Sequence, residues 1–174
     1  PLLNNQAYWF ITVPAKERDP KYQTFGKPHL QAYFNHFPNE VRQILDKQSE
    51  TGILLNDIYD MKPLRTFVYG RTILLGDAAH ATTPNMGQGA GQAMEDAIVL
   101  VNCLEAYDFD KALERYDKLR VKHTAKVIKR SRKIGKVAQK RNKLIVNIRN
   151  SIMKMMPNAY ASSQATFLYK SKEK

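Results

Sequence analysis

The chain has 174 residues, of which 43% are hydrophobic and 25% are charged, an ordinary composition for a folded protein. This length is enough to bury one sizeable core or parts of two. No apolar run is long enough to cross a bilayer, no signal-peptide pattern opens the chain, and the single cysteine, Cys103, excludes an internal disulfide. We therefore expect a cytoplasmic protein, and we find no metal-ligand cluster in its sequence.

The first fifty residues predict one strand followed by two short helices. Residues 6–13 are aromatic and β-branched and predict a strand that Pro14 ends. The aromatic rings of Tyr8, Trp9 and Phe10 would pack a sheet face or line a substrate cavity. Residues 27–37 show helical spacing, and Asn39 is placed to cap a second helix. The side chains expected to face inward are Leu30, Tyr33, Phe34, Phe37, Val41, Ile44 and Leu45.

Three further extended segments are predicted before residue 76. Residues 53–61 suggest one extended strand, and residues 66–69 suggest a short one after Pro63. Gly70 and Arg71 then form a turn with an exposed arginine. Residues 72–75 are apolar throughout, which is typical of a fully buried strand.

Residues 76–91 are predicted to place one carboxylate beside the start of a helix. Gly76 and Asp77 end the strand, residues 82–85 have turn chemistry, and Gly87, Gly89 and Gly91 alternate before the helix. The apolar positions expected on that helix are Ala93, Met94, Ala97, Ile98, Leu100 and Val101. Free N–H groups at a helix start attract an anion or an electron-rich carbonyl, and glycine lets a flat ligand approach. An aspartate accepts hydrogen bonds from hydroxyl groups. A ligand with a hydroxylated chain and a planar, anionic edge fits this description, as a flavin nucleotide does.

Two other glycine-loop interpretations do not fit the spacing. The pattern G-x-G-x-x-G is not matched because glutamine, Gln92, follows Gly91, and a phosphate-binding loop would end in a lysine that is absent here. The remaining alternative is a glycine-rich helix entry with a solvated aspartate. That alternative leaves the glycines unexplained, because they weaken a helix without serving a ligand.

The same residues resemble a known family. Residues 76–80 (GDAAH), Pro84, residues 87–89 (GQG) and residues 95–97 (EDA) resemble the second flavin-binding motif of FAD-dependent aromatic-ring monooxygenases, the para-hydroxybenzoate-hydroxylase-like family. Residues 87–97 (GQGAGQAMEDA) are most similar to the branch of salicylate, urate and zeaxanthin-type oxygenases. The resemblance implies an α/β flavoprotein fold, α+β in this segment. Strands of a substrate domain would precede a flavin-contacting loop and C-terminal helices.

The resemblance also implies a role for each residue of the motif. Asp77 would hydrogen-bond the ribityl chain of FAD, and the backbone N–H groups of Ala90 and Gly91 would face the pyrimidine edge of the isoalloxazine. Pro84 would lie beside the ring and is the one candidate for positioning at the reaction centre. Gly76, Gly87 and Gly89 complete the expected cofactor contacts, and no substrate residue is implied.

The implied enzyme reduces FAD with NAD(P)H and forms a flavin C4a-hydroperoxide with O2. It would hydroxylate or epoxidise an aromatic, polycyclic or lipophilic small molecule. The family's N-terminal Rossmann half is missing from this sequence, so we expect a longer enzyme and an inactive segment. The expected organisation is part of a substrate domain over 1–69, a flavin-contacting segment over 70–106, C-terminal helices over 107–157 and a tail over 158–174.

The C-terminal third is predicted to be helical and strongly basic. A long helix starts at Phe109 and Asp110, with weak points at Gly135 and at Arg141 and Asn142. The family resemblance implies a break near Asn142, so a second helical piece is expected over roughly 143–156, ended by Pro157. The stripe expected to be buried on the long helix is Leu113, Tyr116, Leu119 or Arg120, His123, Val127, Ile134 and Val137 or Ala138. Residues 111–154 contain 16 Lys and Arg against two acidic residues, a net charge of +14.

This charge raises an alternative function, a basic helical module that binds nucleic acid or an anionic membrane surface. The lack of interleaved aromatic residues argues against nucleic acid. Peripheral contact with a membrane stays open. Phe167, Leu168 and Tyr169 are the only docking candidates in the tail.

Overall fold

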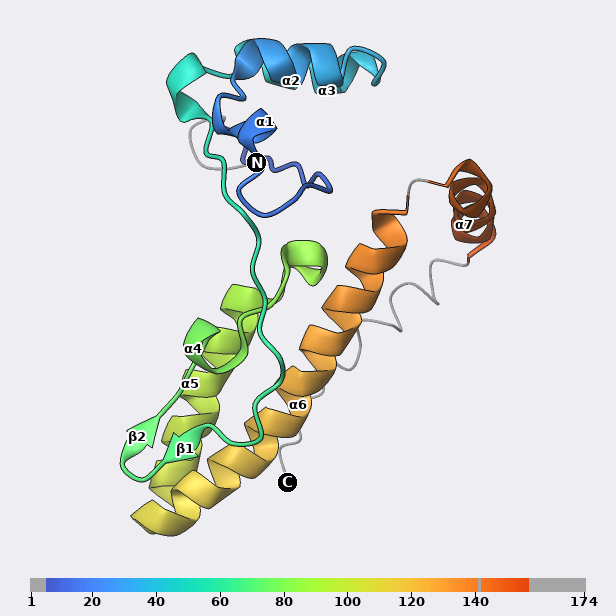
Figure 1. Ribbon diagram of the computed structural model, residues 1–174. Coiled ribbons are helices and arrows are strands. Elements are labelled where there is room, and N and C mark those ends of the chain that lie inside the picture. The colour runs from blue at the N-terminus through green and yellow to red at the C-terminus, as the bar shows by residue number, and fades with distance from the viewer. Residues whose placement is uncertain (1–5, 141, 157–174) are drawn as a thin grey trace. The chain divides into compact units, whose positions relative to one another are not determined.

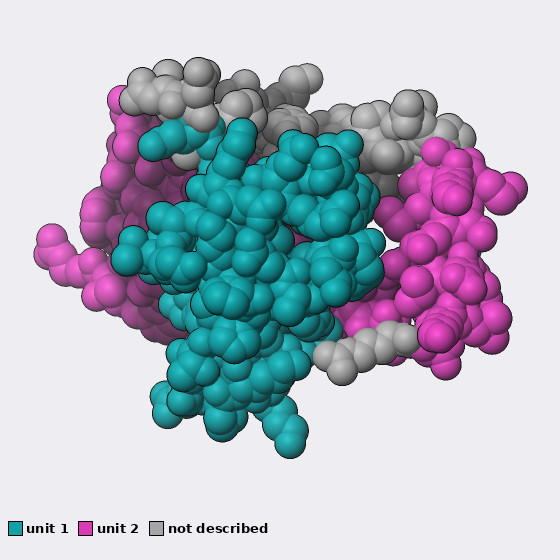
Figure 2. Space-filling model, turned by 90° about the horizontal axis from the view of Figure 1, so that it is seen from above, with its two compact units in different colours: residues 1–58 teal, residues 59–174 magenta. Residues whose placement is uncertain are grey.

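The computed structural model describes residues 6–140 and 142–156, and the chain divides into two compact units, residues 1–58 and residues 59–174 (Figures 1 and 2). The predictions for residues 158–174, including the docking of Phe167, Leu168 and Tyr169, lie outside the described residues. The functional division at residue 69 stays a prediction. Residues 59–69 belong to the same compact unit as the glycine-rich segment.

The first unit is built from short helices: α1 (Pro20–Gln23), α2 (Lys27–Tyr33), α3 (Asn39–Lys47) and the 3₁₀ turn η2 (Glu50–Gly52). The predicted helix over 27–37 is confirmed but ends at Tyr33, and Asn39 is the first residue of α3, with Pro38 in the capping position. The core consists of Leu30, Phe34 and Leu45, with Trp9, Phe25, Val41 and Ile53 packed against it. Tyr33, Phe37 and Ile44, expected inside, are exposed instead.

The strands predicted over 6–13 and 53–61 are wrong for this chain. Both segments run without regular secondary structure, and among the described residues the one strand pairing joins residues 68–69 to residues 72–73. Strand propensity alone does not form a strand, because each backbone N–H and C=O needs a ladder partner. Trp9 packs on the core and donates a hydrogen bond from its indole N–H to Gln48 Oε1 at 3.1 Å, while Tyr8 and Phe10 are exposed.

The second unit begins with an antiparallel hairpin of β1 (Val68–Tyr69) and β2 (Thr72–Ile73). Val68 pairs with Ile73, and Gly70 has a φ of 60°, the left-handed conformation that this turn needs and glycine adopts without strain. The predicted strands and turn are therefore present but shorter than expected. Residues 73–75 are half-buried and Thr72 is exposed, so the prediction of a fully buried strand is wrong here.

The hairpin leads through α4 (Asp77–His80) and the 3₁₀ turn η3 (Pro84–Met86) into two long helices, α5 (Gly89–Ala106) and α6 (Phe109–Ala138). These two helices pack against each other, and α6 continues beyond α5 (Figure 1). Asp108 caps α6 by accepting a hydrogen bond from the backbone N–H of Lys111 at 3.0 Å. The main core consists of Phe67, Ala79, Cys103, Ala112 and Tyr116.

The final described helix, α7 (Lys143–Met155), follows a break at the predicted place. The side chain of Asn142 accepts hydrogen bonds from the backbone N–H groups of Leu144 and Ile145, which explains why a new helix starts there. Within the described ranges, no helix is both long enough and apolar enough to span a membrane.

Two predicted burial patterns need correction. On α5 the buried residues are Gln92, Asp96 and Cys103, whereas Met94 and Ile98 are 64% and 60% exposed. On α6 the stripe is confirmed at Leu113, Tyr116, Arg120 and Val127. Beyond Val127 the buried residues are Ile128, Ser131 and Gly135, and Ile134 and Val137 are exposed.

Candidate functional site

The strand end and the helix start predicted to form the site lie against each other. Gly76 is buried with φ 57° and ψ −138°, a conformation that essentially only glycine adopts. A Cβ added to Gly76 would lie 3.2 Å from the Cβ of Ala93, so its backbone packs on the beginning of α5. Asp77, the next residue and the first of α4, is exposed to solvent. The fold therefore holds one exposed carboxylate next to the start of α5.

The start of α5 presents backbone donors that no side chain caps. The first helical hydrogen bond runs from the N–H of Gln92 to the carbonyl of Gln88, at 2.8 Å. Gln88 occupies the capping position without a side-chain hydrogen bond to the helix. The N–H groups of Gly89, Ala90 and Gly91 precede that first bond, so they are available to a ligand. The same helix end carries partial positive charge.

The glycines at this helix start are not explained by the fold. Gly89 would have no heavy atom within 4 Å of an added Cβ, and Gly91 would meet only the Gln88 side chain, at an ordinary 3.7 Å. Both residues are helical, where alanine is more favourable than glycine. Gly87 differs, because its φ of 61° itself favours glycine. The absence of side chains at 89 and 91 therefore points to a ligand that approaches the backbone from outside.

A buried ionic network connects the two halves of the site. The carboxylate of Asp96 is fully buried and accepts hydrogen bonds from the Gly76 N–H at 2.9 Å and from Arg120 Nε at 2.6 Å. It also lies 2.5 Å from His80 Nε2. Burial by itself raises the pKa of Asp96, but the contacts with His80, Gly76 and Arg120 outweigh it and hold that pKa below its usual value. Asp96 is therefore a carboxylate that fixes the turn at Gly76 to α5.

Arg120 completes this network from the neighbouring helix α6. Its guanidinium is buried and donates to the carbonyl of Gln92 at 3.1 Å and to Gln92 Oε1 at 2.9 Å, and it contacts Glu95 Oε1 at 2.9 Å. A buried guanidinium needs this number of acceptors to offset its loss of hydration. Nearby, Tyr116 donates from its hydroxyl to the carbonyl of Leu74 at 3.0 Å.

The loop that carries Pro84 is anchored on α6 by hydrogen bonds. Ser131 Oγ donates to the carbonyl of Thr83 at 2.7 Å and lies 2.8 Å from Thr83 Oγ1. Asn85 Nδ2 donates to Thr83 Oγ1 at 2.8 Å and to the carbonyl of Ser131 at 3.2 Å. A Cβ on Gly135 would lie 2.5 Å from Asn85 Nδ2, so this glycine makes room for the loop. Pro84 itself stays exposed.

The residues predicted for the site therefore belong to one region of the second unit. Gly76 and the α5 start are in contact, Asp77 follows Gly76, and Pro84 and Gly87 lie on the connecting loop. Asp96, Arg120 and Ser131 were not assigned roles from the sequence. The available signal for Asp96 was its spacing from Gln92, because residues four apart lie on the same side of a helix.

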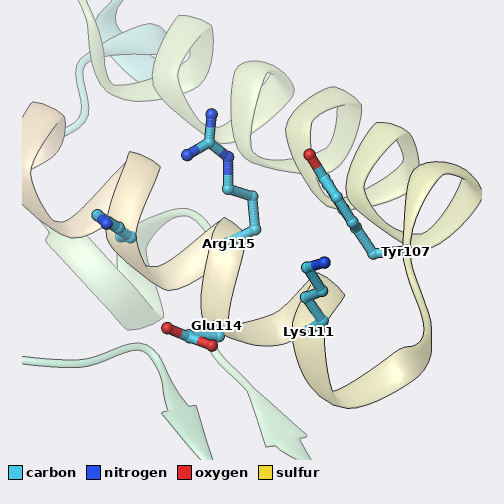
Figure 3. Close-up of a pocket in the computed structure, with 5 residues that line it drawn as sticks. Tyr107, Lys111, Glu114 and Arg115 are labelled. Atoms are coloured by element: carbon cyan, nitrogen blue, oxygen red, sulfur yellow. The ribbon is translucent and has the colours of Figure 1, made fainter. Parts of the chain in front are cut away.

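A surface hollow elsewhere in this unit is unrelated to the site. It has a volume of about 220 Å³ and is lined by Tyr107, Lys111, Glu114, Arg115 and Lys118, where α5 ends and α6 begins (Figure 3). Tyr107 follows the last residue of α5, whereas the glycines are at its first. A helix of 18 residues is about 27 Å long, which separates the hollow from the glycine-rich start.

The uncapped, glycine-rich helix start and the carboxylate next to it are typical of a protein that binds a flavin nucleotide. Comparison with known proteins identifies the family. Residues 5–131 match the family described as FAD binding domain, and the chain belongs to it. The chain is 37% identical over 157 residues to the aurachin C monooxygenase/isomerase of Stigmatella aurantiaca, covering 90% of this chain and 41% of the relative. It is 33% identical over 135 residues to an FAD-dependent urate hydroxylase of Mycolicibacterium vanbaalenii, covering 76% of this chain and 34% of the relative.

A solved structure shares the fold. The crystal structure of Klebsiella pneumoniae HpxO complexed with FAD and uric acid superimposes with a TM-score of 0.76 at 25% identity, covering 91% of this chain and 40% of that one. This likeness confirms the predicted fold class, a mixed α and β part of a larger flavoprotein fold. The chain spans between about a third and two fifths of the length of these relatives. The family does not support the alternative in which a basic helical module is the main function.

Proposed function

We propose that this chain is the flavin-contacting part of an FAD-dependent monooxygenase. The intact enzyme would use NAD(P)H and O2 to hydroxylate or epoxidise an aromatic or lipophilic small molecule. The observation that carries this proposal is the pair of helical glycines, Gly89 and Gly91, that the fold does not require, at an uncapped helix start beside Asp77. Relatives named as monooxygenases and hydroxylases support the reaction class.

The residues present fit FAD in chemistry and in space. Asp77 is exposed and would accept hydrogen bonds from ribityl hydroxyl groups. The N–H groups of Ala90 and Gly91 would donate to the N1–C2=O edge of the isoalloxazine. The open space at Gly89 would let the flat ring lie against the backbone. FAD, when bound, supplies the redox and oxygen chemistry.

The protein's contribution in this proposal is electrostatic and geometric. Backbone donors and the positive end of α5 stabilise negative charge on the pyrimidine edge, by roughly a few kcal/mol in a dry site. Pro84, which lacks an N–H group and has a fixed φ, gives the ring a rigid neighbour at the reaction centre. Gly76 and Gly87 allow the backbone turns that bring these groups together. Asp96 maintains this arrangement without contacting the cofactor.

A further part of the enzyme is proposed to cover α5 and to hold the ADP half of FAD. Four apolar residues on α5 are spaced three or four apart and exposed: Met94, Ile98, Val101 and Leu104. A contiguous exposed apolar stripe of this kind normally marks an interface. The 174-residue chain alone is therefore expected to purify without flavin. The buried, unpaired thiol of Cys103 fits the proposed cytoplasmic location.

The test uses the purified intact enzyme. We expect stoichiometric FAD, and NAD(P)H oxidation that an aromatic substrate stimulates, with one atom of ¹⁸O₂ incorporated into the product. Incorporation of oxygen from labelled water instead would contradict the monooxygenase assignment. Stoichiometric yellow absorbance of the 174-residue chain alone would contradict the requirement for a further part.

A further inference from the structure

Helix α7 carries a continuous apolar stripe that is exposed. Leu144, Ile148, Ile152 and Met155 follow one another at intervals of four, four and three residues, and they are 68%, 53%, 56% and 83% exposed. Ile145 widens this stripe and is also exposed. None of the residues of α7 is buried. Apolar side chains at this spacing lie on one side of a helix.

The other side of α7 is polar and basic. Lys143, Asn147, Asn150 and Lys154 form a second stripe at intervals of four, three and four residues. Helix α7 itself contains Lys143, Arg149 and Lys154 and no Asp or Glu. An anionic partner that can accept apolar side chains is therefore complementary to this surface.

The helix is held in place by the chain itself. Asn142 caps its first turn, and Arg149 donates from Nη1 to the carbonyl of Ala138 at 2.9 Å, at the last residue of α6. A preformed helix avoids much of the entropic cost that a segment pays when it folds on binding. The apolar stripe is thus presented as a ready surface.

We propose that α7 docks on an anionic lipid bilayer, with the stripe of Leu144, Ile148, Ile152 and Met155 in the acyl boundary and the lysines at the phosphates. An apolar stripe combined with a lysine-bearing polar face is the arrangement of interfacial helices. Nucleic acid would satisfy the charge but not the apolar stripe, and residues 117–156 include no Phe, Tyr or Trp for base stacking. The proposal goes beyond the flavin site and does not depend on it.

The first experiment measures binding of the intact enzyme to vesicles by flotation, because the apolar stripe of α5 would also be exposed in the 174-residue chain alone. Vesicles of phosphatidylcholine with about 30 mol% phosphatidylglycerol should bind at 0.1 M salt, and pure phosphatidylcholine at least about tenfold more weakly. Salt at 0.5 M should weaken binding to the anionic vesicles. The double variant Ile148→Asn/Ile152→Asn should bind at least about tenfold more weakly. The control Asn147→Gln/Asn150→Gln changes only the polar side of the same helix and should bind as the parent does.

The second experiment measures depth with bromine-labelled lipids. The variant Ile152→Trp should be quenched strongly, whereas Asn150→Trp, on the polar side of the same helix, should be quenched no more than the parent protein. Equal quenching of the two variants, or no binding to anionic vesicles at low salt, would overturn the proposal. So would vesicle binding that the Ile148→Asn/Ile152→Asn variant retains in full, because that result would assign binding to charge alone.

Discussion

The substitution Asp96→Asn tests the network that joins the two halves of the candidate site. Asparagine has the same shape as aspartate, but one of its two oxygens is replaced by a donor NH₂ group. Asp96 is fully buried and faces Arg120 Nε at 2.6 Å, His80 Nε2 at 2.5 Å and the Gly76 N–H at 2.9 Å. The variant leaves at least one of these groups without an acceptor and removes the buried countercharge of Arg120.

The expected loss of stability is about 3 kcal/mol. Breaking a buried ion pair by removing one partner costs about 3–5 kcal/mol, because a buried charge is left uncompensated. We place the value at the lower end of this range because Glu95 and Gln92 still contact the Arg120 guanidinium. This amount is a large fraction of the roughly 5–15 kcal/mol that stabilises a typical domain.

The assay is urea unfolding of the full chain at pH 7, followed by far-UV circular dichroism. The control is Glu114→Gln, an exposed position of α6 beyond its first turn, which should change the free energy of unfolding by no more than about 0.5 kcal/mol. A loss below about 1 kcal/mol for Asp96→Asn would refute the reasoning, because it would mean that Asp96 does not compensate Arg120.

The pH dependence of the same variant provides a second readout. The folded-state pKa of Asp96 is lowered from its ordinary value of 3.8, so the unfolded state binds the proton more tightly. The stabilisation from Asp96 is therefore complete well above that ordinary value and is lost as the pH falls through the folded-state pKa. The difference in stability between the parent and Asp96→Asn should be constant from about pH 7 to 5 and should narrow towards pH 3. A difference that widens on acidification would contradict the assigned shift.

Three other substitutions test separate parts of the account. Gly89→Ala in the intact enzyme should leave the apoprotein as stable as the parent or up to about 0.5 kcal/mol more stable, because the added methyl meets no atom, yet it should weaken FAD binding as measured by calorimetry. Unchanged affinity would show that no ligand approaches there. Tyr116→Phe should cost about 1–2 kcal/mol in urea unfolding, since it leaves the carbonyl of Leu74 without its donor. Burial and the nearby charge of Asp96 raise the pKa of Tyr116 in the folded protein. Above about pH 10 only the unfolded state releases this proton, so the parent should lose stability there. The Tyr116→Phe variant should lack that loss. Gly135→Ala should stabilise the Asn85→Ala variant by about 1 kcal/mol, because alanine is a better helix former than glycine. It should stabilise the parent by clearly less, because the added methyl group displaces the Asn85 side chain. Equal effects in the two proteins would contradict the contact between Gly135 and Asn85.

The local chemistry of the chain was predictable from the sequence because short-range rules determine it. The turn at Gly70, the helix start among the glycines and the end of α5 near Ala106 follow from glycine conformation and turn residues. The break before α7 was expected from the family resemblance, and the structure gives its local reason, because Asn142 caps α7 through its own side chain. The family resemblance rested on residues 76–97.

The burial pattern was less predictable because it depends on which surfaces meet. The apolar residues of α5 suggested a buried face with Met94 and Ile98, but Asp96 and Gln92 are inside, where Arg120 supplies a countercharge. Hydrophobic periodicity does not reveal a buried ion pair between two helices, because it describes the apolar pattern of each helix separately. The aromatic residues 6–13 failed as a strand for a related reason, since a strand needs a partner that no described part of this chain provides.

The most direct test of the central claim is the FAD content of an Asp77→Ala variant of the intact enzyme. Asp77 is exposed at the first position of α4, so its removal should leave the far-UV circular dichroism unchanged. A charge-assisted hydrogen bond contributes about 1.5–3 kcal/mol, and its loss should weaken FAD binding at least about tenfold. The account predicts a sharply reduced ratio of flavin to protein after purification. An unchanged ratio and an unchanged dissociation constant would contradict it.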